Sequence, residues 1–230
     1  ALGIKNCAYT SGHSVGELAA AAISGAIGDE DALRLVRARG IEMAKAAALS
    51  PAGMSAVLGG DREVVLKKLE ELKLVAANDN GGGQIVAAGD LAALAALSEN
   101  PPEGARVRAL AVAGAFHTSF MEPAVEPLRT LAATIQTAPT TISVISNKDG
   151  EVVSDGGEVL TRIVNQIANP VRWDLCMQTL KNLGVTGVIE LPPAGTLVGL
   201  LKRGAPEIET FALKSADDLS AAKEFAGRHA

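Results

Sequence analysis

The sequence predicts an α/β fold made of two units, and three observations lead to this prediction. Short apolar runs of strand length alternate with longer helix-like segments over much of the chain, as in a mainly parallel sheet covered by helices. Residues 51–113 depart from that alternation and have an element order of their own. Hydrophobic residues make up 48% of the 230 residues but aromatic residues only 3%, so we expect a large, helix-rich core of small side chains.

The N-terminal segment is predicted to hold one strand and two helices. A short buried strand is expected over 6–10, followed by a helix over 15–27. The second helix begins at the three acids 29–31, where carboxylates stabilise the positive end of the helix dipole, and it ends before Pro51.

Residues 51–113 are predicted to form a small inserted domain. Strands are expected at 54–58, 74–78, 84–88 and 105–112, and helices at 61–72 and 90–97. This β-α-β-β-α-β order is the ferredoxin-like arrangement. The glycines at 81–83 are interpreted as a hairpin turn, because no Lys-Ser/Thr pair follows them as in a phosphate-binding loop. The larger domain is then discontinuous, comprising residues 1–50 and 114–230.

The rest of the chain returns to alternating helices and strands. Helices are expected at about 123–136, 160–167, 169–183 and 196–201, and strands at 142–146, 185–191 and 211–213. The last residues have the composition of a polar tail, in which His229 is expected to be disordered.

A G-x-S-x-G motif spans residues 12–16, between the first strand and the first helix. The glycines permit a tight turn, and the helix N-terminus offers N–H groups to a developing oxyanion, so this context is typical of an acyl-transfer nucleophile at Ser14. The motif makes the larger domain α/β-hydrolase-like. The alternative, in which Ser14 caps the helix in a capping box with Glu17, leaves the flanking glycines unexplained.

A serine nucleophile needs a base, and the chain has three histidines. His13 is adjacent to Ser14, and neighbouring side chains on a turn usually diverge. His229 lies in the C-terminal tail. His117 lies at the predicted domain junction, so it is the candidate base by elimination. No acid is an obvious partner for it, and a backbone carbonyl is able to hold the Nδ1–H instead.

Arg39 is predicted to lie in the apolar stripe of the second helix. Helical spacing puts it on the same side as several apolar residues, whereas Arg34 and Arg37 fall on the far side. The apolar residues of this stripe are Ala32, Leu35, Val36, Met43 and Ala46. A buried guanidinium needs an anion, which is either a carboxylate of the protein or the carboxylate of a substrate.

Composition excludes several function classes. The net charge of −5 argues against nucleic acid as the main partner. No apolar run reaches membrane-spanning length, and no signal peptide is visible. Cys7 and Cys176 lack metal-ligand spacing, so we expect reduced, buried thiols in a cytoplasmic protein with no metal.

Together these motifs resemble the malonyl-CoA:acyl-carrier-protein transacylase family, the acyltransferases of fatty-acid and polyketide synthesis. The matching pieces lie in family order along nearly the whole chain. They are residues 12–17, 39–40, 114–117, 146–150, 169–173 and 199–203. The predicted insertion falls where the family has one.

The resemblance implies roles at matching positions. Ser14 is then the acylated nucleophile and His117 the general base and acid. Arg39 binds the malonyl carboxylate, and the backbone carbonyl of Gln166 orients the histidine. Phe116 matches a residue associated with malonyl rather than methylmalonyl preference.

Further positions follow from the same resemblance. Asn78 and Asn80 line the cleft, and the backbone N–H of Val15 is an oxyanion donor. The family also carries a G-Q-G-x-Q segment near its N-terminus, whose glutamine lies by the oxyanion hole. This sequence has no such segment, so we expect a chain that lacks the family's N-terminal part and is impaired, since losing one such donor costs about a hundredfold or more in rate.

The implied reaction is malonyl transfer from coenzyme A to the phosphopantetheine thiol of acyl carrier protein through a malonyl-serine intermediate. No cofactor is implied beyond malonyl-CoA as substrate. Acyl carrier protein is the implied partner, and Lys202 and Arg203 are candidates for a basic rim that meets it. Two alternatives stay open: a serine esterase or thioesterase of α/β-hydrolase type, with His229 as base, and an inactive carrier-protein-binding fragment.

Overall fold

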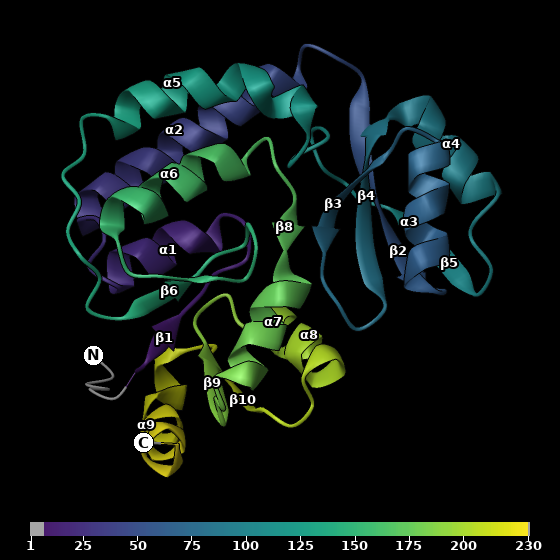
Figure 1. Cartoon of the computed structure of the whole chain (residues 1–230). Helices are drawn as coiled ribbons and strands as arrows, with labels where there is room; N and C mark the ends of the chain where they lie inside the picture. Colours follow the sequence, from purple (N-terminus) through teal and green to yellow (C-terminus); the bar gives the residue numbers. More distant parts are fainter. Residues whose placement is uncertain (1–6, 230) are drawn as a thin grey trace.

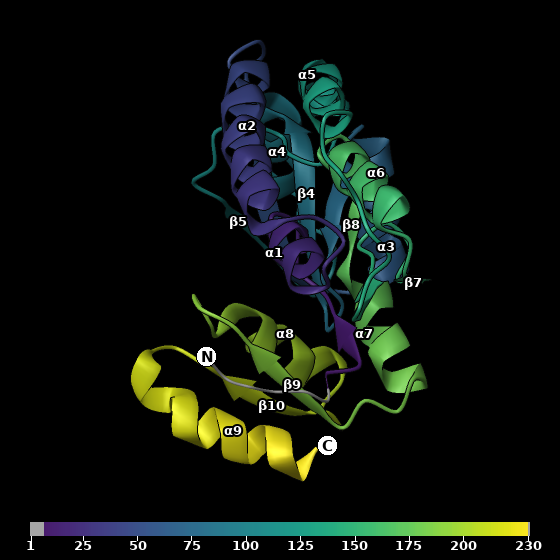
Figure 2. The same cartoon turned by 90° about the vertical axis from the view of Figure 1, so that its left-hand side faces the viewer.

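The computed structural model describes residues 7–229, and its elements gather in three groups (Figure 1). One group is a set of helices beside a small sheet, the second is a five-stranded sheet with two helices, and the third is C-terminal. The view at right angles (Figure 2) shows most of the C-terminal group at one end of the molecule, below the other two groups.

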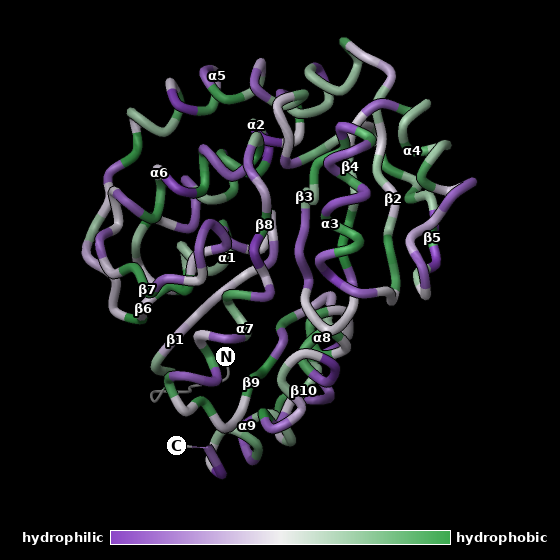
Figure 3. Tube along the Cα trace, turned by 45° about the vertical axis from the view of Figure 1, so that its right-hand side comes forward, coloured by the Kyte–Doolittle hydropathy of each residue, from purple (hydrophilic) through white to green (hydrophobic). Residues whose placement is uncertain are grey.

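The first group consists of helices packed beside a three-stranded sheet. Its helices are α1 (Gly16–Ile23), α2 (Asp29–Ala47), the 3-10 turn η1 (Ser119–Met121), α5 (Glu122–Ala132) and α6 (Gly156–Gln166). Its strands are β1 (Tyr9–Thr10), β6 (Ser143–Ile145) and β7 (Val152–Val153). Figure 3 shows hydrophobic and hydrophilic residues alternating along α5 and α6, as expected of helices with one buried face. Those buried faces share one core with α1 and α2.

The second group has the β-α-β-β-α-β order predicted for residues 51–113. Its elements are β2 (Ala52–Gly59), α3 (Arg62–Glu71), β3 (Val75–Asp79), β4 (Gln84–Asp90), α4 (Leu91–Glu99) and β5 (Ala105–Ala109). The strand order is β5-β2-β4-β3-β8, in which β8 (Val171–Arg172) adds a strand parallel to β3. The carboxylates of Asp61 and Asp90 cap α3 and α4 by accepting backbone N–H groups of the first turn.

The two faces of this sheet have different partners because strand side chains alternate. Ile85 and Ala87 of β4 belong to the core that includes α3 and α4. Val86 and Ala88, on the opposite face, pack with Ala115. The second face of the sheet therefore lies against the segment that carries His117.

The C-terminal group pairs two parallel strands beside three helices. Its elements are α7 (Trp173–Asn182), β9 (Gly187–Glu190), α8 (Thr196–Gly204), β10 (Glu209–Ala212), the 3-10 turn η2 (Ala216–Asp218) and α9 (Leu219–Arg228). The Glu190 carboxylate accepts hydrogen bonds from the N–H groups of Gly195, Leu197 and Val198, which anchors the start of α8.

The sheet of the larger region differs in part from the predicted mainly parallel sheet. The pairs β1–β6 and β9–β10 are parallel, but they belong to separate sheets. The β6–β7 pair is antiparallel because the turn at 146–150, with Gly150 at φ 73°, folds the chain straight back. The prediction of a helix over the whole of 169–183 is wrong at its start, where the chain first forms β8. This strand pairs with β3, and the N–H of Arg172 donates to the Asn147 carbonyl at 2.7 Å.

Two further predictions were wrong. The C-terminus is not a disordered tail, because α9 buries Ala222 and Phe225, and the His229 ring contacts Thr186 and Glu209. Cys7 is exposed, whereas Cys176 is buried. Within residues 7–229, no helix is both long and apolar enough to cross a membrane.

Replacing Leu97 by alanine should lower the free energy of unfolding by about 2–5 kcal/mol, because Leu97 is fully buried against the five-stranded sheet. Leu91 lies on the same helix with 52% of its surface exposed, so Leu91→Ala should change that free energy by about 0.5 kcal/mol or less. Urea unfolding followed by circular dichroism measures both variants. Equal destabilisation by the two substitutions would contradict this assignment of the core.

Candidate active site

Ser14 lies on a strained turn between β1 and α1. Its φ of 54° is unusual for a residue with a side chain, so the surrounding contacts must hold it there. The backbone N–H of Ser14 donates to Asn147 Oδ1 at 2.8 Å, and Asn147 Nδ2 donates to the Gly12 carbonyl at 2.8 Å. A Cβ on Gly12 would collide with the backbone of Gly16, so this turn requires glycine at 12.

Ser14 and His117 form a hydrogen-bonded pair. The distance from Ser14 Oγ to His117 Nε2 is 2.7 Å, and His117 Nδ1 lies 2.8 Å from the Gln166 carbonyl oxygen. Because a carbonyl oxygen only accepts, Nδ1 carries the proton and Nε2 is free to accept the serine O–H. Burial lowers the pKa of His117 to about 4, so the imidazole is a neutral base at pH 7.

Arg39 reaches the same oxygen atom. Its Nη2 donates to Ser14 Oγ at 3.0 Å, and burial is the main cause that lowers its pKa to about 10. Among the residues described, Arg39 has no carboxylate within ion-pair distance, so it presents a half-buried, unpaired positive charge beside the nucleophile. Such a charge attracts a bound carboxylate.

The start of α1 offers a backbone N–H to an oxyanion formed beside Ser14. Val15 occupies the N-cap position of α1, and in the part of the chain described its backbone N–H has no acceptor. An unpaired N–H at a helix start is suited to a developing negative charge. The capping-box interpretation is wrong, because the Ser14 side chain makes no capping hydrogen bond and points to His117.

The five-stranded sheet supplies the neighbouring polar residues. Asn78 and Asn80 are both 6% exposed at the end of β3. Asn80 Oδ1 lies 2.8 Å from His13 Nε2, and the His13 ring meets the Trp173 ring edge-on at 5.7 Å. His13 is therefore held away from Ser14 and fastens the nucleophile turn to β3. Phe116 is half-buried between the cores of the first two groups.

A family model for the acyl transferase domain matches residues 1–224. The chain belongs to the acyl transferase domain family. The malonyl CoA-acyl carrier protein transacylase of Mycobacterium tuberculosis strain H37Rv is 54% identical over 209 residues, covering 91% of this chain and 69% of that protein. The protein of the same name from Bacillus subtilis strain 168 is 34% identical over 221 residues, covering 93% and 70%.

Solved structures agree with this membership. The crystal structure of MCAT from Mycobacterium tuberculosis is 53% identical with a TM-score of 0.90, covering 93% of this chain and 70% of that one. A complex of PlMCAT with AntF, described as a type II PKS acyl-carrier protein with its malonyl-transacylase, has a TM-score of 0.89 at 28% identity and covers 96% and 74%. This acyl transferase chain thus spans about 70% of the length of relatives such as the Mycobacterium protein.

Two predicted partner residues of this acyl transferase lie apart from the serine. Lys202 and Arg203 are exposed in the last turn of α8. Arg203 Nη2 donates to Gln84 Oε1 at 3.0 Å, so it contacts the β3–β4 hairpin. Neither side chain contacts Ser14 or His117.

Sequence reasoning missed Glu17 and Asn147. Glu17 is 2% exposed, and its carboxylate accepts from the Asn147 backbone N–H and from Gln166 Nε2, both at 2.5 Å. Helical spacing could have indicated that Glu17 is buried, because Ala20 and Ala21, three and four positions beyond it, lie on the same face and are buried. Asn147 falls in the matching segment 146–150, but the resemblance assigned it no role.

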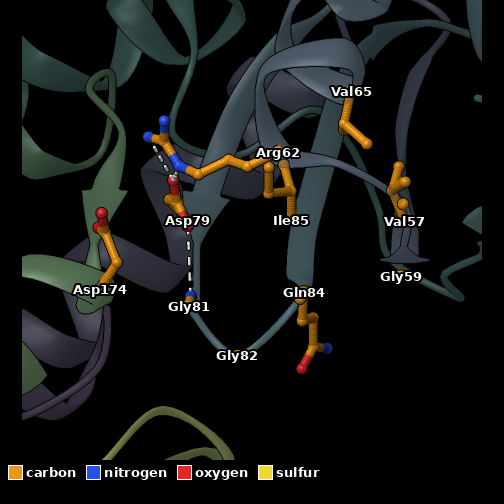
Figure 4. Close-up of a pocket in the computed structure, with 12 residues that line it drawn as sticks. Val57, Gly59, Arg62, Val65, Asp79, Gly81, Gly82, Gln84, Ile85 and Asp174 are labelled. Carbon is orange, nitrogen blue, oxygen red and sulfur yellow. Dashed lines mark hydrogen bonds and ion pairs between the residues drawn. The ribbon is translucent and has the colours of Figure 1, made fainter.

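A separate cavity of about 160 Å³ lies at the β3–β4 hairpin (Figure 4), and neither Ser14 nor His117 is among the residues that line it. Arg62 Nε donates to Asp79 Oδ2 at 3.0 Å, and Asp174 lies on the opposite wall. The Arg62–Asp79 pair lies within the second group, whereas Asp174 of α7 pairs with Arg172 at 2.7 Å. No cluster of three or more His, Cys, Asp or Glu side chains is placed to hold a metal ion within residues 7–229.

Replacing His117 by alanine should reduce the rate at which a fluorophosphonate labels Ser14 by about 10²- to 10⁴-fold, because the base that takes the serine proton is removed. His229 contacts Glu209 instead, so His229→Ala should label at the wild-type rate. Labelling stopped at set times and followed by mass spectrometry measures the rate for the wild type and both variants. Loss of labelling in His229→Ala but not in His117→Ala would favour the esterase arrangement.

Proposed function

We propose that this chain transfers malonyl groups from coenzyme A to the phosphopantetheine thiol of an acyl carrier protein, through a malonyl ester of Ser14. The observation that carries the proposal is the Arg39 guanidinium, 3.0 Å from the oxygen of a Ser-His pair. The names of the relatives support the same reaction. Carrier protein as the acceptor is supported by the solved complex of a malonyl-transacylase with its acyl-carrier protein.

The first half-reaction forms the acyl-enzyme. Ser14 gives its proton to His117 Nε2 as its oxygen attacks the thioester carbonyl. The backbone N–H of Val15 donates to the resulting oxyanion. The carbon–sulfur bond then breaks, and the departing thiolate takes the proton from His117.

The second half-reaction reverses this order. The phosphopantetheine thiol gives its proton to His117 and attacks the carbonyl of malonyl-Ser14. The ester bond breaks, and Ser14 recovers the proton from His117. The Gln166 carbonyl keeps the imidazole in one tautomer throughout, which the hydrogen bond at Nδ1 supports.

Substrate selection is assigned to residues around the serine. Arg39 pairs with the malonyl carboxylate, and Phe116 crowds the α-carbon so that malonyl is preferred over methylmalonyl. Asn78 and Asn80 shape the cleft wall, a role supported by their burial at the end of β3. No resident cofactor is proposed, since malonyl-CoA itself brings the reactive thioester.

The carrier-protein surface is assigned to Lys202 and Arg203. Carrier proteins are usually acidic, and both residues are exposed cations. The hydrogen bond from Arg203 to Gln84 supports a position beside the β3–β4 hairpin. The relevant attraction is long-range and screened by salt.

We also propose two domains, a larger α/β-hydrolase-like domain of residues 1–50 and 114–230 and a ferredoxin-like domain of residues 51–113. The strand order β5-β2-β4-β3 supports the second. A cytoplasmic location is proposed because both cysteines are free thiols.

Mixing the chain with malonyl-CoA should yield a mass increase of one malonyl group, because Ser14 is positioned to attack the thioester. Ser14→Ala should show none. Intact-mass spectrometry on folded protein measures this. Absence of the adduct in folded wild-type protein would favour the inactive carrier-protein-binding alternative.

Arg39→Ala should lower the preference for malonyl-CoA over acetyl-CoA by roughly 10- to 100-fold, since hydrogen bonds to a charged group contribute about 1.5–3 kcal/mol. The matched control is Arg37→Ala, an exposed arginine on the same helix. Initial rates of Ser14 acylation with the two thioesters measure the ratio. An unchanged ratio in Arg39→Ala would contradict the carboxylate site.

A further inference from the structure

We propose that Glu17 is a positioning residue for acyl transfer, whose single buried carboxylate holds both the turn that carries Ser14 and the carbonyl that orients His117. This inference deepens the proposed function and rests on it. The Glu17 carboxylate hydrogen-bonds to neither the Ser14 hydroxyl nor the His117 ring, so its effect passes through Asn147 and Gln166.

The first branch leads from Glu17 to the nucleophile. Glu17 Oε1 accepts the backbone N–H of Asn147 at 2.5 Å. The Asn147 side chain then accepts the N–H of Ser14 and donates to the carbonyl of Gly12, both at 2.8 Å. Asn147 is fully buried, so these bonds fix the strained turn on both sides of His13.

The second branch leads from Glu17 to the base. Gln166 Nε2 donates to Glu17 Oε2 at 2.5 Å and lies 3.2 Å from Asn147 Oδ1. Gln166 is the last residue of α6, where backbone carbonyls lack helical partners. Its carbonyl accepts the Nδ1–H of His117 at 2.8 Å and the backbone N–H of Asn169 at 3.1 Å. Holding the Gln166 side chain adds a third contact that fixes the direction of that carbonyl.

The site requires an ionised carboxylate at position 17. Both oxygens of Glu17 face N–H donors, so each must accept. A protonated Glu17 or a glutamine at this position would have an O–H or NH₂ donor facing one of these N–H groups, so that hydrogen bond would be lost. The backbone N–H of Asn147 is unable to turn away, so one branch would have to break.

The charges around Glu17 come from every element packed on it. Arg39 on α2 and Arg162 on α6 favour the ionised form of Glu17, whereas Asp149 in the turn after β6 opposes it. Cys176 on α7 faces Glu17 as a neutral thiol, because burial and the Glu17 carboxylate raise its pKa. Arg162 also binds Asp149 at 2.6 Å, which ties α6 to the turn that contains Asn147. Burial is the largest effect and raises the pKa of Glu17 to about 7.

Glu17→Gln should reduce fluorophosphonate labelling of Ser14 at pH 8 by roughly 10- to 100-fold, because small misplacements of reacting groups cost about that much. In the wild type the labelling rate should rise with pH through a midpoint near 7, as Glu17 ionises. Because the pKa of His117 is about 4, titration of His117 would not change the labelling rate near pH 7. The variant should lose this rise. Glu30→Gln, at an exposed acid of α2, is the matched control.

A structural readout accompanies the kinetic one. The native pKa of Glu17 lies above its ordinary value of 4.5, so native protein retains the proton longer than unfolded protein. Wild-type melting temperature should therefore fall as the pH rises from 4.5 to 7, and less so in Glu17→Gln. If Glu17→Gln does not fold, Gln166→Leu interrupts the same branch and should also slow labelling.

Labelling of folded Glu17→Gln within twofold of wild type, or an unchanged midpoint, would overturn the proposal. Wild-type labelling by Gln166→Leu would do the same. The fluorophosphonate does not depend on the substrate assignment. A wild-type chain that reacts with it but not with malonyl-CoA would therefore refute the malonyl transfer alone.

Discussion

The hydrogen bond between His117 Nδ1 and the Gln166 carbonyl is the contact on which the candidate site depends. It replaces the carboxylate that orients the histidine in a Ser-His-Asp triad, and it adds no negative charge. Within residues 7–229, no acidic side chain hydrogen-bonds to Ser14 or His117. The Arg39 guanidinium is thus left unpaired at the nucleophile. An acid in the usual triad position would repel a substrate carboxylate and compete for this arginine.

Both reacting residues are held in the left-handed region of backbone space. Ser14 has φ 54° and His117 has φ 62°, and each such conformation costs about 1–3 kcal/mol. A hydrogen bond from the backbone N–H holds each residue in this conformation. Ser14 N–H donates to Asn147 Oδ1, and His117 N–H donates to the Ile167 carbonyl. These acceptors lie on the turn after β6 and at the end of α6. The packing of the helical group therefore maintains a geometry that neither segment would adopt alone.

The sequence predicts those features well that depend only on residues close to one another along the chain. The G-x-S-x-G turn identifies Ser14, helical spacing places Arg39 toward the core, and the alternating patterns of 51–113 predict the observed order of elements. Helical spacing also placed Val36 in the buried stripe, but it is 36% exposed, because it lies at the margin of that face.

Other features depend on contacts between distant segments, which local patterns do not contain. Glu17 and Asn147 are separated by 130 residues, so neither motif alone indicates a shared hydrogen bond. The pairing of β8 with β3 involves only two residues of each strand. Helix α9 has a narrow apolar stripe, and burial of Phe225 requires its contacts with Phe211 and His229.

The β3–β4 hairpin shows how the second group is fixed relative to the serine. A Cβ on Gly81 would lie 2.7 Å from Met177 Cε, and one on Gly82 would lie 2.8 Å from Arg203 Cβ. The missing side chains therefore allow the turn to approach α7 and α8. Together with the Asn80–His13 hydrogen bond and the β3–β8 pairing, this contact joins β3 to the nucleophile turn at several points. Since moving β3 would break all of these contacts together, it forms a fixed wall of the site rather than a lid.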